Sequence, residues 1–136
     1  MACILVIDDN EALLETVKVI LARHGHAVRT APDGRCGMIA MGRHSVDLVI
    51  TDIVMPQQGG IETILQLRAS APGLPILAIS GGGGGMGHRG LLEAAARLGA
   101  TDTLAKPFGA AALLAKVNAL LQTVIADVAA SRNAAA

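Results

Sequence analysis

Aromatic side chains are nearly absent from this chain, in which Phe108 is the only ring. Proteins that bind single-stranded nucleic acid stack bases on such rings, so this class is not favoured. An excess of one charge is also lacking, because 11 basic and 11 acidic residues give a formal net charge of zero. That balance removes the general attraction to DNA, RNA or an anionic membrane surface. We therefore expect neither nucleic acid nor membrane as a partner.

Cysteine and long apolar runs are also scarce. The two cysteines, Cys3 and Cys36, lack metal-site spacing, and we interpret both as small core residues suited to a reducing compartment. No stretch approaches the roughly 20 residues of a membrane-spanning helix, and the start of the chain lacks a signal-peptide pattern. With 136 residues, 52% of them hydrophobic, the chain fits one compact domain. We expect it to be cytoplasmic.

Apolar runs alternate with helical patterns along the chain. Strands are predicted at Cys3–Ile7, Ala27–Thr30, Leu48–Asp52, Ile76–Ser80 and Thr101–Leu104. Helices are predicted at Glu11–Arg23, Gly34–Arg43, Ile61–Ala71, His88–Leu98 and Gly109–Val128. Gly25 and Gly99 each follow a helical pattern and are expected to end it. Alternation with short loops predicts an α/β fold, a doubly wound, flavodoxin-like parallel sheet covered on both faces.

The apolarity of the strands predicts their order in the sheet. The first, third and fourth strands are continuous apolar runs typical of interior strands, whereas the second and fifth are polar enough for edges. This fits the order 2-1-3-4-5. In that order a ligand crevice opens at the carboxyl ends of strands one and three, where Asp8, Asp9 and Asp52 are expected.

Three carboxylates at one crevice repel one another and call for a cation. An all-oxygen, hydrated site suits Mg²⁺. Asp52, at the tip of a strand, would remain ionised and could act as a nucleophile toward phosphorus. Lys106 would contribute positive charge to the phosphoryl oxygens, and Ser80 a hydroxyl that bonds one of them.

The chain resembles the response-regulator receiver domain. The matching motifs are Ile7-Asp8-Asp9, Asp52-Ile53-Val54-Met55-Pro56 followed by Gly60, Ser80 after the fourth strand, and Lys106-Pro107-Phe108 after the fifth. The resemblance implies that Asp52 is the phosphoacceptor, that Asp9 binds Mg²⁺ directly, and that Asp8 acts largely through water. It also makes the backbone carbonyl of Val54 a metal ligand, Ser80 the switch hydroxyl and Lys106 the phosphate contact, followed by a cis peptide to Pro107.

The resemblance further implies how the chain works in a cell. A histidine kinase or phosphotransfer protein would phosphorylate Asp52, and the output would be altered binding to an unidentified downstream protein. Slow loss of the phosphoryl group would not make the chain a turnover enzyme. Residues 1–121 would form the receiver domain, and residues 122–136 a helical extension with a disordered tail from Ser131.

Two departures from the family pattern affect the expected switch. Thr103 stands where the family usually has an aromatic residue, so the ring that follows the switch hydroxyl is missing. After Ser80 the chain has a glycine run, Gly81 to Gly85. We expect Gly81, Gly82 and Gly83 to sample many conformations at rest. Two alternatives stay open: the loop becomes ordered when Asp52 is phosphorylated, or it is a tolerated insertion that is mobile in both states.

Three alternative functions remain open from the sequence. Gly85-Met86-Gly87-His88-Arg89-Gly90 matches a dinucleotide-binding fingerprint, although too few strands and helices follow it for that fold. A phosphatase using Asp52 would need a general acid where Val54 stands. A receiver-like interaction module that is never phosphorylated is the third, although the chain keeps all the acidic residues.

The last predicted helix carries an apolar stripe at alternating spacings of three and four. Its members are Leu114, Val117, Leu121, Val124 and Val128, widened by Leu113, Leu120 and Ile125. A helix from Gly109 to Val128 would be about 30 Å long, more than a short strand can cover. Its end is predicted to project, either as a homodimer or partner contact or as a frayed alanine-rich tail.

Overall fold

The computed structural model describes residues 2–53, 59–80 and 93–135, with side chains described as far as residue 122. The strands are β1 (Cys3–Ile7), β2 (Ala27–Ala31), β3 (Leu48–Asp52), β4 (Ile76–Ser80) and β5 (Asp102–Ala105). The helices are α1 (Glu11–Arg23), α2 (Gly34–Arg43), α3 (Gly60–Ser70) and α5 (Ala110–Ala135), and residues 93–98 are also helical. Among the described residues, no helix combines the length and apolarity that crossing a membrane requires.

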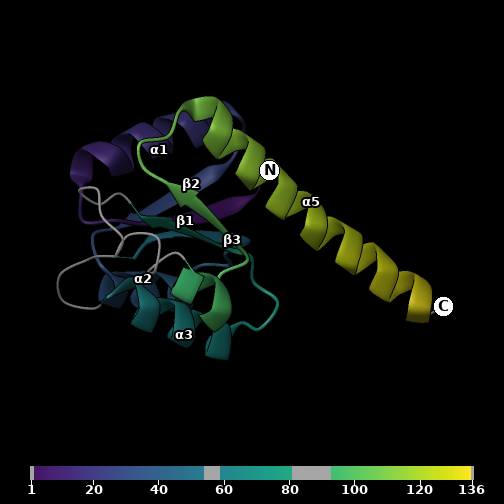
Figure 1. The fold of residues 1–136 in the computed structure, drawn as a ribbon. Helices are drawn as coiled ribbons and strands as arrows, with labels where there is room; N and C mark the ends of the chain where they lie inside the picture. Colours follow the sequence, from purple (N-terminus) through teal and green to yellow (C-terminus); the bar gives the residue numbers. More distant parts are fainter. Residues whose placement is uncertain (1, 54–58, 81–92, 136) are drawn as a thin grey trace.

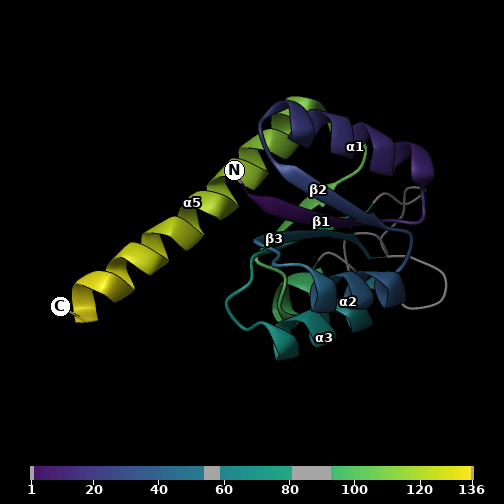
Figure 2. The same ribbon diagram turned by 180° about the vertical axis from the view of Figure 1, so that it is seen from behind.

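The strands form one parallel sheet in the order β2-β1-β3-β4-β5, which confirms the predicted topology. Figures 1 and 2 show the sheet between two layers of helices, with α1 and α5 on one face and α2 and α3 on the other. β3 and β4 are buried along their whole length, whereas most of β2 and β5 is exposed or half-buried. The edge strands are therefore the polar ones, as their sequences indicate.

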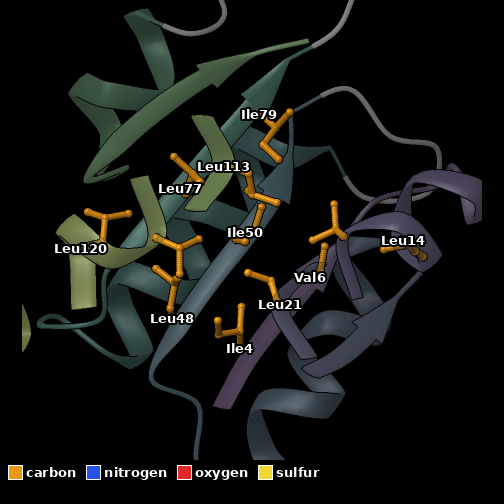
Figure 3. Packing of buried hydrophobic residues seen from close by; sticks show 12 residues of the cluster. Ile4, Val6, Leu14, Leu21, Leu48, Ile50, Leu77, Ile79, Leu113 and Leu120 are labelled. Carbon is orange, nitrogen blue, oxygen red and sulfur yellow. The ribbon is translucent and has the colours of Figure 1, made fainter. Parts of the chain in front are cut away.

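Each face of the sheet has its own apolar core. On one face, Ile4, Ile50 and Leu77 of the sheet pack with Leu21 of α1 and Leu113 of α5 (Figure 3). On the other face, alternate residues of the same strands pack against α2, α3 and the helical residues 93–98. This two-sided burial explains why the interior strands are continuously apolar.

Helix boundaries follow the expected signals. Asn10 caps α1 by accepting the N–H of Leu13 at 3.1 Å. Asp33 caps α2 through the N–H of Cys36 at 2.8 Å. Gly25 follows α1 with a φ of +86°, a backbone conformation that favours glycine.

Two sequence interpretations need correction. The helix α5 continues to Ala135, so its predicted end near Val128 and a disordered tail from Ser131 are wrong. No glycine or proline interrupts it, and alanine is the strongest helix former. Cys36 is exposed and Cys3 only half-buried, so neither is a core residue. On α2 the neighbouring Gly37, not Cys36, lies against the core.

Candidate functional site

An acidic cluster lies at the carboxyl ends of β1 and β3, as predicted. Asp8 follows β1, Asp52 ends β3, and the two parallel strands are neighbours in the sheet. Carboxylate oxygens of Asp8, Asp9 and Asp52 all lie within 4.8 Å of one another. Asp8 and Asp52 are buried, at 1% and 7% exposure, whereas Asp9 is exposed. The cluster therefore has two enclosed carboxylates and one that faces solvent.

Backbone N–H groups orient the two buried carboxylates. Oδ1 of Asp8 accepts the N–H of Asn10 at 2.9 Å. Oδ1 of Asp52 accepts the N–H of Ile53 at 2.8 Å. In both residues this leaves Oδ2 directed at the same cation, the ammonium of Lys106.

Lys106 follows β5 and places its charge inside the cluster. Its Nζ lies 2.8 Å from Oδ2 of Asp8 and 3.5 Å from Oδ2 of Asp52. Burial is the largest single influence on the Lys106 pKa and lowers it, but the two carboxylates together outweigh burial and raise the pKa above its usual value. Lys106 is therefore fully protonated at neutral pH. The peptide from Lys106 to Pro107 is cis, as the resemblance implied.

Ser80 and Thr103 lie on the two neighbouring strands. Ser80 is buried at the end of β4, and its carbonyl accepts the N–H of Lys106 at 2.9 Å. It therefore sits beside the acidic cluster, because β4 pairs with β3. Thr103 lies earlier on β5, opposite Ala78, and is half-buried. The structure thus places Ser80, but not Thr103, at the carboxyl edge of the sheet.

Other candidate positions lie outside the described residues. These are Val54, the glycines Gly81, Gly82 and Gly83, and the stretch Gly85 to Gly90. Their proposed roles remain predictions.

Sequence reasoning missed a backbone contact between the start of α3 and the residue that follows β3. Gly60, the first residue of α3, donates its N–H to the carbonyl of Ile53 at 2.8 Å. A Cβ on Gly60 would lie only 2.3 Å from the carbonyl oxygen of Asp52 and from the Cα of Ile53. The sequence motif includes Gly60, but only the structure shows that α3 approaches the backbone of Asp52 too closely for any side chain.

Comparison with known proteins agrees with this geometry. The family model described as the response regulator receiver domain matches residues 4–118. Response regulator MprA of Mycolicibacterium vanbaalenii is 36% identical over 134 residues, which is 97% of this chain and 55% of that protein. The chain thus spans about half the length of this relative.

Solved structures show the same likeness. The isolated receiver domain of NtrX from Brucella abortus superposes with a TM-score of 0.82 at 32% identity, covering 88% of this chain and 98% of that one. A longer NtrX chain from the same organism gives a TM-score of 0.89 at 31% identity, covering 96% of this chain and 29% of that one. With the acidic cluster and its lysine in the expected places, the chain belongs to the response regulator receiver domain family.

Proposed function

We propose that Asp52 accepts a phosphoryl group from a histidine kinase or phosphotransfer protein, and that the phosphorylated form binds a downstream protein differently. The family assignment supports phosphorylation-based two-component signalling. The single observation that carries the assignment to Asp52 is its position. It is the enclosed carboxylate at the end of the central strand, with Oδ1 fixed by a backbone N–H and Oδ2 facing Lys106.

The acidic cluster fits a divalent cation. Its donors are all carboxylate oxygens within 4.8 Å of one another, which is the ligand type that Mg²⁺ prefers. Asp8, Asp9 and Asp52 would hold the ion, with the backbone carbonyl of Val54 as a further ligand. Bound Mg²⁺ would supply positive charge that offsets the charge developing on the phosphoryl oxygens.

Asp52, Lys106 and Ser80 would carry out the transfer itself. An oxygen of Asp52 forms the bond to phosphorus while the bond from phosphorus to the donor's histidine nitrogen breaks. Lys106, already held in the cluster by Asp8, contacts the transferred group as a point charge. Ser80 ends the neighbouring strand, and its hydroxyl becomes a hydrogen-bond donor to the phosphoryl group.

We also propose how the phosphoryl group is lost, what the glycine loop does and where in the cell the reaction takes place. The phosphoryl group would leave only by slow hydrolysis, since Val54 cannot supply a proton as a phosphatase would need. Gly81, Gly82 and Gly83 would become ordered around the phosphoryl group, and Thr103 would be an ordinary edge-strand residue. The reaction would take place in the cytoplasm, as expected for a receiver that is phosphorylated by a histidine kinase.

The end of α5 is the proposed site of a homodimer contact. Figure 1 shows α5 continuing well past the sheet. The apolar stripe in the sequence of this helix suits pairing with a second copy.

Intact mass measurement tests the phosphoacceptor. Wild-type protein incubated with acetyl phosphate and Mg²⁺ is expected to gain one phosphoryl group, and to gain none when Mg²⁺ is chelated. Asp52→Asn should fold and remain unlabelled. Asp102→Asn is the matched control, because Asp102 pairs with Lys116 at 2.9 Å at the start of β5, away from the cluster. Labelling of Asp52→Asn at the wild-type rate would remove the assignment.

A further inference from the structure

Arg68, near the end of α3, ties together two connections at the end of the sheet opposite the acidic cluster. Its Nη1 donates to the carbonyls of Pro72 and Leu74, each at 2.7 Å, and to that of Ala71 at 3.4 Å. Its Nε donates to the carbonyl of Gly99 at 3.1 Å, and Nη2 donates to the same oxygen. One guanidinium thus joins the connection before β4 to the connection before β5.

The donors of Arg68 are fully used. A guanidinium has five N–H donors in a fixed plane, and Arg68 makes six contacts with acceptors, the sixth being from Nη2 to the hydroxyl of Thr101 at 3.5 Å. Among the described residues no carboxylate forms an ion pair with Arg68. The residue therefore acts as a cross-link between carbonyls, a role that the single point charge of a lysine cannot reproduce.

Gly99 ends the helical residues 93–98 in a conformation that Arg68 holds. Its φ is +138°, and the N–H of Ala100 donates to the carbonyl of Ala95 at 2.9 Å. This is the bond of a Schellman helix end. A Cβ on Gly99 would lie 3.3 Å from Cβ, Cγ and Nε of Arg68. The positive charge also lies at the carboxyl ends of α3 and of residues 93–98, where it offsets two helix dipoles.

The position of this contact matters for the switch. The chain leaves the phosphorylation site at Ser80 and returns to the sheet through Gly99 and Thr101. Thr101 is itself bonded to β4, since its N–H donates to the carbonyl of Ile76 at 2.8 Å and its hydroxyl accepts the Ile76 N–H at 3.0 Å. One end of the connection is thus next to Asp52, and the other end is fastened to α3 and β4.

We propose that Arg68 is a clamp that keeps the Gly99 end of this connection fixed in both signalling states, so that phosphorylation-dependent change is confined to the Ser80 end. The inference rests on the proposed phosphorylation of Asp52. It specifies a surface that does not carry the signal: the turn at Gly99 to Thr101 is the same in both states, so a partner that contacts only this turn cannot distinguish them.

Hydrogen exchange with and without beryllofluoride and Mg²⁺ tests the clamp. The reporters are the amides of Ala100 and Thr101, both hydrogen-bonded in the structure. The variants are Arg68→Met, which removes the cross-link, and Arg68→Lys, which keeps the charge. Arg97→Met is the matched control, because Arg97 is an exposed arginine on the helical residues 93–98, next to the reporter amides. Fluorine NMR confirms that the mimic is bound.

In wild type and Arg97→Met, exchange at the two reporter amides should change by less than about twofold when the mimic binds. In Arg68→Met and Arg68→Lys it should change by roughly tenfold, the effect of losing a charge-assisted hydrogen bond. A tenfold response in wild type, or variants with the wild-type pattern, would overturn the clamp. Should Arg68→Met fail to fold, the wild-type and Arg68→Lys results decide.

Failure of the mimic to bind wild type would count against the proposed phosphorylation. The clamp would then be judged without the mimic. Arg68→Met must exchange faster than Arg97→Met at both reporter amides, and equal rates would overturn it.

Discussion

Replacing Gly60 by alanine should disturb both the fold and the proposed phosphorylation site. The added Cβ would lie 2.3 Å from the carbonyl oxygen of Asp52 and from Cα of Ile53, and 2.7 Å from the carbonyl oxygen of Ile53. Ordinary contacts to a Cβ begin near 3.4 Å. The start of α3 or the end of β3 must therefore move by about 1 Å, and neither can do so by rotating a side chain.

The expected cost follows from two opposing effects. Overpacking a close-packed site costs about 1–3 kcal/mol, and weakening the bond from the Gly60 N–H to the Ile53 carbonyl adds about 1 kcal/mol. Alanine in place of glycine in a helix returns up to about 1 kcal/mol. The free energy of unfolding should therefore fall by about 1–4 kcal/mol, which lowers Tm by roughly 3–20 °C for a domain of this size.

Gly59→Ala is the matched control on the adjacent residue. Gly59 has a φ of −65° and a ψ of 154°, which alanine adopts freely, and nothing lies within 4 Å of its Cβ position. Its unfolding free energy should stay within about 1 kcal/mol of wild type. Urea denaturation followed by circular dichroism gives the stabilities, and acetyl phosphate labelling at a temperature where both variants are folded gives the rates. Equal stability and labelling of the two variants would refute the argument.

Three further outcomes are expected. Gly37→Ala should destabilise the fold because its Cβ would lie 2.4 Å from Cδ1 of Ile7. Adding Ile7→Val, which removes that atom, should recover part of the loss in a double-mutant cycle of unfolding free energies. His26 has a lowered pKa, chiefly because of burial and then nearby positive charge, and its Nδ1 accepts the N–H of Ala2 at 3.3 Å. The unfolded chain binds the proton more readily, so wild type should lose stability as pH falls through about 6.5, and His26→Gln should lose less in the same titration. Sedimentation should show dimers of the full chain and monomers of a chain truncated after Leu121, whereas monomers of both at high concentration would exclude a homodimer through α5.

The sequence predicted the sheet and most of the site because both depend on short-range patterns. Apolar runs identified β1, β3 and β4, and polar composition identified the edges. In a parallel sheet the carboxyl ends of the strands share one edge, so Asp8, Asp52 and Lys106 had to meet once the order was known. Gly25 and Gly99 likewise ended their helices where the pattern indicated.

Contacts to backbone atoms that are distant along the chain leave no such pattern in the sequence. Gly60 looks like any helix-start glycine, and its approach to Asp52 depends on how α3 packs under β3. The sequence pattern predicts Arg68 to be a surface arginine on a helix. Its partners are backbone carbonyl oxygens, and because every residue has one, the sequence cannot indicate which of them are bound. The length of α5 differs from the prediction for another reason: an alanine-rich composition suggests a disordered tail, but nothing in this segment stops a helix.

The division of the core between two faces sets an order for folding during synthesis. The core under α2 and α3 is complete by Ala100, whereas the other draws on Ile4 near the start of the chain and on Leu113, Val117 and Leu120 near its end. A chain emerging amino end first can close the former face while the latter still lacks α5. Until α5 has been synthesised, α1 is the described helix that covers Ile4 and the other apolar sheet residues of that face. The interval before α5 is synthesised is thus when this face of the sheet is most exposed to non-native association.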